Sequence, residues 1–427
     1  MENGKGSLSA LFPFVVFLIL FVGSGIITDD FYHLPVLSAV LVASAVALLM
    51  NRKFPFADKV ERFAQGAGQR SIIIMVFIFL LAGAFGATAK GMGAVDSTVN
   101  LALSVLPEHL LVVGLFIIAA FISLAMGTSV GTIATLAPIA VGISTQTGIS
   151  PALTLATVVG GAMFGDNLSI ISDTTIAAVR TQHTNMKDKF RTNFFIVLPA
   201  AIATLILLFF LTPSVATTVE AADFNIVKIL PYIGVLIAAL WGVHVITVLA
   251  GGIFFAGVIG LWEGNYTISS LAKTISEGIS GMSELILLTL LIGGLVEIIR
   301  ANGGLQYLLY ITTKKIKSKI GAAWSIAGLV SLTNLATANN TIAILTAGPL
   351  AKDIADHYNI NPKQSASLLD IFSCAVQGLI PYGAQILIAS QAGNLTPVAL
   401  LSYSFYPLLI ALCGVIAIYV RQARIRP

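Results

Sequence analysis

Long apolar runs separated by short polar stretches fill this sequence. A helix needs about 20 apolar residues to cross a bilayer, and several runs in the first half of the chain have this length. The segment 90–107 is shorter and carries Lys90 and Asp96, so we expect it at the membrane interface. The elements predicted here are helices at 8–27, 32–50 and 71–89, the interfacial segment, a hairpin near 110–146, a helix at 151–180 interrupted around 165–173, and a helix at 190–212.

The second half of the chain repeats this plan without a gap. A shift of 211 positions brings Gly83 onto Gly294 and Pro138 onto Pro349, so that residues 8–212 correspond to residues 219–423. The elements predicted for the second repeat are helices at 226–242, 243–262 and 283–300, an interfacial segment at 303–313, a hairpin near 322–355, a broken helix at 363–391 and a helix at 398–420.

Each repeat therefore contains five predicted crossings and one hairpin. Because the number of crossings is odd, the second repeat must lie upside down in the membrane relative to the first. Inverted repeats with discontinuous helices at their interface are typical of secondary transporters. The pattern predicts an all-α polytopic membrane protein made of two inverted repeats.

The two predicted hairpins join their apolar arms through small polar residues, at 127–132 in the first repeat and at 337–341 in the second. We expect both hairpins to be re-entrant, with tips near the middle of the membrane. Irregular backbone at that depth is tolerated only where it is buried in protein or lines a water-filled cavity.

Composition and charge agree with a membrane location. Hydrophobic residues make up 57% of the chain, charged residues only 10%, and the mean hydropathy is +0.95, whereas soluble domains carry about 25% charged residues. If both termini are cytoplasmic, 20 of the 23 lysines and arginines lie inside, and only Lys90, Lys228 and Lys273 lie outside. The positive-inside rule thus predicts a multi-pass cell-membrane protein with this orientation. The small net charge, +4, gives no reason to expect a nucleic-acid partner.

Polar side chains at membrane depth are functional candidates, because burying them is costly. In the first repeat they gather at the hairpin tip and at the helix break, where unwound carbonyls, hydroxyls and carboxylates suit a cation such as sodium. These candidate cation- and proton-binding residues are Thr128, Ser129, Asp166, Ser169, Ser172, Asp173 and Thr174, with Asp166 and Asp173 as the sodium-binding carboxylates. The alternative is that these side chains only cap the half-helices.

The equivalent segments of the second repeat are polar but uncharged. We expect them to form a substrate site or a second half of the cation site, made of Asn339, Asn340, Thr341, Gln377 and Gln385. Asp370 lies on a polar stripe with Ser367, Cys374 and Gln377 at helical spacing. A buried carboxylate of this kind can bind a proton or a cation, or it can serve only in interior hydrogen bonding.

Two other function classes fit the sequence less well. Residues 127–131 match the G-x-S-x-G pattern of serine hydrolases, but that motif needs a preceding strand and a nearby base, and the preceding run reads as an apolar helix. We therefore expect no enzyme. An ion channel is disfavoured because neither a ring of charges nor a filter repeat is visible.

The segment Gly-Asp-Asn-Leu-Ser-Ile-Ile-Ser-Asp-Thr-Thr at 165–175 resembles the Gly-Asp-Lys-x-Ser-Pro-x-Ser-Asp-Thr-Thr stretch of the NhaC-type sodium/proton antiporter family. The resemblance extends over nearly the whole chain in segment order. It implies membership of the ion-transporter superfamily, with two inverted repeats, a homodimer and an elevator-type motion. Asn167 and Ile170 depart from the family pattern, which has a basic residue and a proline there.

The sequence thus predicts a sodium/proton antiporter of the cell inner membrane that works by elevator-type alternating access. Sodium and protons are the transported species, and no cofactor is expected. The alternative is a sodium- or proton-coupled carrier of a small organic solute such as an amino acid or an organic acid. The two hypotheses differ in whether the uncharged half of the site holds a substrate.

Overall fold

The computed structural model describes residues 6–28, 34–51, 54–105, 107–169, 172–212, 223–241, 243–313, 316 and 318–423. Within these ranges all regular structure is helical, which confirms the predicted all-α class. The first half contains η1 (Leu8–Leu11), α1 (Phe12–Leu18), η2 (Ile19–Gly23), α2 (Ser24–Thr28), α3 (Val36–Leu49), α4 (Phe56–Ala67), α5 (Arg70–Gly91), α6 (Ala94–Val105), α7 (Glu108–Met126), α8 (Ser129–Thr147), α9 (Pro151–Leu168), α10 (Asp173–Thr181) and α11 (Met186–Leu211).

The second half follows the same order of elements. It contains α12 (Ile226–Leu240), α13 (Val245–Trp262), α14 (Ile268–Ser280), α15 (Ser283–Ala301), α16 (Gly304–Thr313), α17 (Lys319–Thr337), α18 (Asn340–His357), α19 (Pro362–Gln377), α20 (Ala384–Gly393), α21 (Pro397–Leu401) and α22 (Phe405–Ala423).

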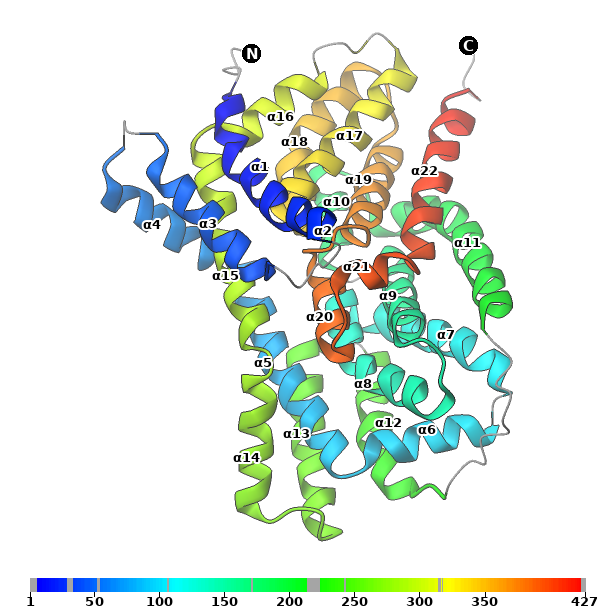
Figure 1. Ribbon diagram of the computed structural model, residues 1–427. Coiled ribbons are helices and arrows are strands. Elements are labelled where there is room, and N and C mark those ends of the chain that lie inside the picture. Colours follow the sequence, from blue (N-terminus) through cyan, green and yellow to red (C-terminus); the bar gives the residue numbers. More distant parts are fainter. Residues whose placement is uncertain are drawn as a thin grey trace.

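One group of helices joins the two halves by reciprocal packing. Helix α4 packs against α15, and α14, its equivalent 211 residues later, packs against α5 (Figure 1). At the second crossing the backbones touch, because a Cβ added to Gly83 would collide with the carbonyl oxygen of Gly278, and one added to Gly278 with that of Gly83. Small residues permit such close helix contact in membranes. Helices α3–α5 and α13–α15 thus form a shared scaffold.

A second group surrounds the polar segments. Helix α8 packs against α20 of the other half, and α10 packs against α18 in the same reciprocal way. Both α9 and α19 lie in the interior, with most of their side chains buried. This arrangement brings the two hairpin tips and the two helix breaks into one region.

Several predicted element boundaries differ from the structure: the helix predicted at 398–420 is divided into α21 and α22, and the helix predicted at 190–212 begins at Met186. Helices α4 and α14 form in segments to which the sequence analysis assigns no helix, because their apolar residues recur at helical spacing. The hairpin tips are also shorter than predicted. In the first hairpin only Gly127 and Thr128 separate α7 from α8, so that Thr132 is already helical.

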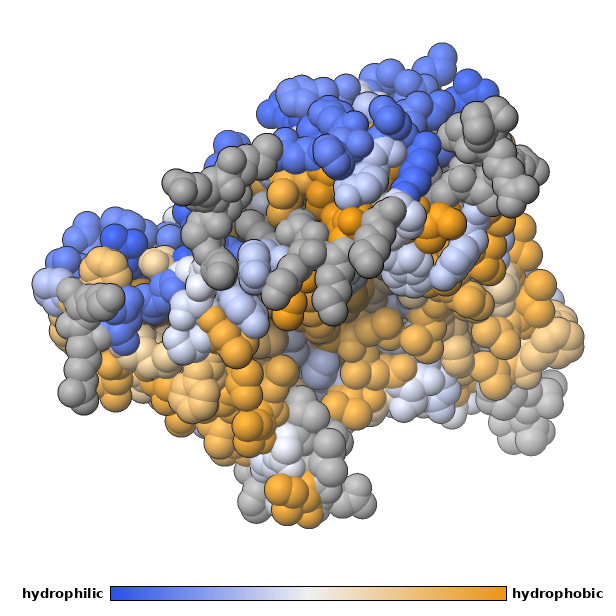
Figure 2. Space-filling model, turned by 90° about the horizontal axis from the view of Figure 1, so that it is seen from above, coloured by the Kyte–Doolittle hydropathy of each residue, from blue (hydrophilic) through white to orange (hydrophobic). Residues whose placement is uncertain are grey.

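The surface suits a lipid environment. Six apolar helical stretches of at least 18 residues occur in the described ranges, and further apolar helices are shorter. Large apolar side chains such as Phe195, Phe210 and Phe254 are more than two-thirds exposed, as expected of a protein surface that faces lipid. Figure 2 looks onto the end where α1 begins, and hydrophilic residues gather over part of it.

Candidate cation site between the repeats

A chain of hydrogen bonds connects the two hairpin tips at the centre of the molecule. Gln377 Nε2 donates to the carbonyl oxygen of Ala338 (3.1 Å) and to Gln385 Oε1 (2.9 Å). Gln385 Nε2 then donates to Ser129 Oγ (3.1 Å), and Ser129 Oγ donates to Asp166 Oδ2 (3.1 Å). Predicted site residues from both repeats are therefore in direct contact.

The tips have the same backbone turn. Gly127 ends α7 with a φ of 67°, and Ala338, its equivalent in the second repeat, ends α17 with a φ of 51°. The left-handed region costs a non-glycine residue about 1–2 kcal/mol. Thr128 and Asn339 follow, and each caps the next helix by accepting a backbone N–H, from Gly131 and Ile342 respectively.

The break between α9 and α10 exposes helix ends beside this chain. Ser172 caps α10 by accepting the N–H of Thr175, and its hydroxyl also donates to the carbonyl oxygen of Asp166 (3.3 Å). Ser169 donates to the carbonyl oxygen of Leu124 on α7 (2.9 Å). Both serines hold the unwound backbone in place instead of facing the cavity described next. Ile170 lies outside the described residues.

A small cavity of about 90 Å³ lies between the tips and the break. Three side chains of α5, Ile74, Met75 and Ile78, form one apolar wall. The polar lining consists of predicted residues from both repeats: Thr128, Ser129, Asp166, Asp173, Thr174, Asn339, Asn340, Thr341 and Gln385. Ligand sites for organic molecules usually measure about 300–1,000 Å³, so this space suits an ion with a few waters.

Asp166 is the buried carboxylate of this cavity. Its side chain is only 6% exposed, and hydrogen bonding from Ser129 does not remove its charge. A buried carboxylate is costly unless a cation or a proton neutralises it. Asp173 also lines the cavity but is exposed at the first turn of α10, where a negative charge is favourable next to the helix N-terminus.

Asp370 does not line this cavity, because it is engaged elsewhere. Its Oδ2 forms an ion pair with Lys189 (2.8 Å) and accepts hydrogen bonds from Asn193 (2.6 Å) and Asn167 (3.2 Å). The role of Lys189 does not follow from the sequence pattern: the positive-inside rule places this lysine among the cytoplasmic charges, whereas it is buried. Lys189 and Asn193 are four residues apart on α11, so both lie on one face of the helix. This spacing is the signal in the sequence for a polar face of α11.

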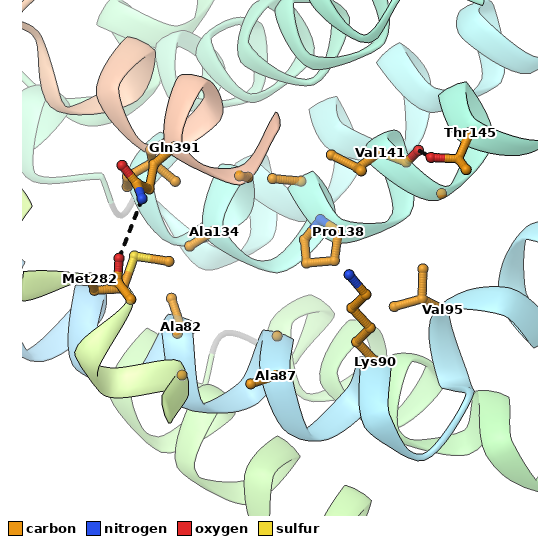
Figure 3. Close-up of a pocket in the computed structure, with 18 of the residues that line it drawn as sticks. Ala82, Ala87, Lys90, Val95, Ala134, Pro138, Val141, Thr145, Met282 and Gln391 are labelled. Atoms are coloured by element: carbon orange, nitrogen blue, oxygen red, sulfur yellow. Dashed lines mark hydrogen bonds between the residues drawn. The ribbon is translucent and has the colours of Figure 1, made fainter. Parts of the chain in front are cut away.

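A larger cavity of about 550 Å³ lies on the side of α14 and α6 (Figure 3). Helix α5 lines the small cavity up to Ile78 and the large one from Ala82 onward. Helix α8 shows the same succession, from Val130 to Ala134. The two spaces are thus about one helical turn apart. The walls of the large cavity are mostly apolar, and Lys90 extends from α5 toward Pro138 of α8 (Figure 3).

Comparison with known proteins places this arrangement in a family. The model of the Na+/H+ antiporter family matches residues 7–212 and again residues 209–422. The chain belongs to the Na+/H+ antiporter family. This membership confirms the resemblance drawn from the motif at 165–175, and it makes the protein a multi-pass membrane transporter.

Two relatives and one solved structure illustrate the similarity. The Na(+)/H(+) antiporter NhaC of Bacillus subtilis is 27% identical over 92% of this chain and 95% of its own length. The malate-2H(+)/Na(+)-lactate antiporter of Bacillus subtilis is 22% identical over 88% of this chain and 87% of its own. The Alcanivorax borkumensis YdaH transporter superposes with a TM-score of 0.43 at 14% identity, over 88% of this chain and 90% of that one.

Proposed function

We propose that this protein exchanges sodium for protons at Asp166. The observation that carries the proposal is a single buried carboxylate in a 90 Å³ cavity, with polar residues of both repeats around it. Sodium and a proton compete for that carboxylate, since either one neutralises it. Ser129 and Thr128 supply hydroxyl oxygens, and Asn339, Asn340 and Gln385 complete the cavity from the second repeat. Relatives described as Na(+)/H(+) antiporters support this assignment.

Access to the cavity is proposed to come from one side in this conformation. The large cavity lies about one helical turn from the small one, between the scaffold helices α5 and α14 and the core helices α8 and α20. Near the symmetry-related helices α10 and α18, Gln182 forms two hydrogen bonds within the core group. Gln182 Nε2 donates to the carbonyl oxygen of Gly348 (2.8 Å), and Ser365 donates to Gln182 Oε1 (2.7 Å). On the basis of the large cavity, we propose that this conformation is open on the side of α14.

The two repeats, 8–212 and 219–423, are proposed to be inverted in the membrane. They would alternate between a state in which the site is open to one side of the membrane and a state in which it is open to the other. The hairpins and broken helices would move as one unit against the scaffold, which is an elevator-type motion. The orientation can be tested with single cysteines at Lys187 and Lys273, which are both exposed. Labelling of intact cells at position 273 but not at position 187 is expected, and the reverse would overturn the orientation.

The transport assay for this proposal uses purified protein in liposomes with an internal pH dye. Sodium added outside acid-loaded vesicles should raise the internal pH, and Asp166→Asn vesicles should not respond. A panel of amino acids and organic acids should leave the signal unchanged. A sodium response that is equal in Asp166→Asn vesicles would remove this carboxylate from the exchange.

A second candidate function is the coupled transport of a small organic solute. It is favoured by the volume of the large cavity, about 550 Å³, which lies within the range of organic ligand sites. A relative described as exchanging malate and lactate also supports it. A pH or sodium response that appears only when an organic acid is present would favour this function over simple exchange.

A further inference from the structure

The ammonium group of Lys189 is buried beside the break of the first discontinuous helix. The side chain is 1% exposed. Its Nζ donates to the carbonyl oxygen of Asn167 (2.9 Å) and to Thr175 Oγ1 (2.6 Å), and it lies 2.8 Å from Asp370 Oδ2. Burial of an ammonium group is very costly unless it is paired in this way.

These three oxygens form the kind of site that binds a sodium ion. Asn167 supplies a carbonyl at the C-terminal end of α9, Thr175 a hydroxyl from the first turn of α10, and Asp370 a carboxylate from α19. Carbonyls freed at unwound helix ends coordinate sodium in transporters. These oxygen ligands come from both repeats, as the polar residues around Asp166 do. The lysine, supplied by α11, occupies the position that a free cation would take.

We propose that Lys189 is a tethered cation that permanently fills a second cation site, so that Asp166 alone exchanges its cation. The proposal rests on the exchange at Asp166 set out above. Lys189 neutralises Asp370, which leaves Asp166 as the buried carboxylate that a transported ion must neutralise. Asp173, the other carboxylate near the break, is exposed. One sodium ion or one proton per molecule is therefore sufficient to neutralise the buried centre.

Asn167 connects the two sites, because it directly follows Asp166 in the chain. Its carbonyl oxygen accepts hydrogen bonds from Lys189 and from Asn193 (3.0 Å). Its side chain donates to Asp370 and accepts a hydrogen bond from the hydroxyl of Tyr406 (2.9 Å). The tethered ammonium thus fixes the backbone that carries the exchanging carboxylate, and Lys189 acts as a positioning residue as well as a fixed charge.

The first test counts sodium ions bound to the full-length protein in detergent, by calorimetry at alkaline pH. Lys189→Ala should gain one sodium site, because the three oxygens remain and the ammonium is gone. Lys189→Ala combined with Asp370→Asn should lose that extra site again. A gain of one sodium site in Lys189→Ala supports the proposal, whatever number of sodium ions the wild type binds. If the wild type binds no sodium, that result counts against exchange at Asp166. An unchanged number in Lys189→Ala would overturn the proposal.

The second test uses affinity and applies even if Lys189→Ala does not fold. Asp370→Asn leaves the ammonium uncompensated near Asp166 and should weaken sodium binding about tenfold, the order of magnitude expected for an uncompensated nearby unit charge at an effective dielectric constant of about 20. Lys189→Met added to Asp370→Asn should restore the affinity to within about threefold of wild type. A double variant as weak as Asp370→Asn, or weaker, would show a merely structural role and refute the proposal.

Discussion

Replacement of Asp166 by asparagine removes the buried charge of the cavity and keeps its shape. The asparagine side chain can still accept the hydrogen bond that Ser129 donates at 3.1 Å, so folding should be little affected. Sodium, however, loses the buried anion that balances it, because Asp166 is only 6% exposed. Breaking a buried charge pair costs about 3–5 kcal/mol, which corresponds to a loss in affinity of roughly two to nearly four orders of magnitude.

Asp173→Asn provides the matched comparison, because it removes a carboxylate from the same cavity at an exposed position. Exposed charge interactions contribute about 0–1 kcal/mol, so sodium affinity should fall by no more than about fivefold. Both variants are to be compared by calorimetric sodium titration and by thermal unfolding without sodium. Equal losses in the two variants would refute the argument from burial, and so would an Asp166→Asn protein that binds sodium within threefold of wild type.

Three further predictions follow from the same geometry. Sodium affinity should increase with pH by up to tenfold per unit while protons occupy Asp166, and level off at alkaline pH; calorimetry across about pH 6 to 9 would contradict competition if the affinity were constant. Gly127→Ala should lower stability by about 1–2 kcal/mol, whereas Ala338→Gly should not, and equal shifts in thermal unfolding would contradict the turn argument. Lys90→Gln should tighten external sodium binding about two- to threefold at low salt but not at high salt. The control Lys273→Gln, outside the cavity, should not change sodium binding, and an effect of Lys90→Gln that does not depend on salt would exclude an electrostatic cause.

Much of the site was predictable because the chain carries its plan twice. The 211-residue shift relates Gly127 to Ala338, and these two residues have the same left-handed turn in the structure. The polar residues of both tips and of the first break were found from their depth in apolar runs, and nine of the predicted residues line the small cavity. Local polarity in an apolar run is a strong signal, since few other positions tolerate it.

The roles within the site were harder to predict, because they depend on contacts between distant segments. Asp370 and Lys189 are far apart in the sequence. Their ion pair neutralises Asp370, which the sequence alone makes a candidate cation ligand. The positive-inside count treated Lys189 as a cytoplasmic charge, since a rule based on loop composition does not detect burial. Lys59 shows the same limit, because it is buried and donates to the carbonyl oxygens of Leu48 and Met50 at the end of α3.

The most direct test of sodium/proton exchange at Asp166 follows both ions in the same vesicles. Proteoliposomes with an acidic interior receive radioactive sodium outside, and sodium uptake is recorded together with internal pH. We predict that sodium enters as protons leave, that each flux requires the opposing gradient, and that Asp166→Asn abolishes both. Sodium uptake without a pH change, or a pH change that persists in Asp166→Asn vesicles, would contradict the account.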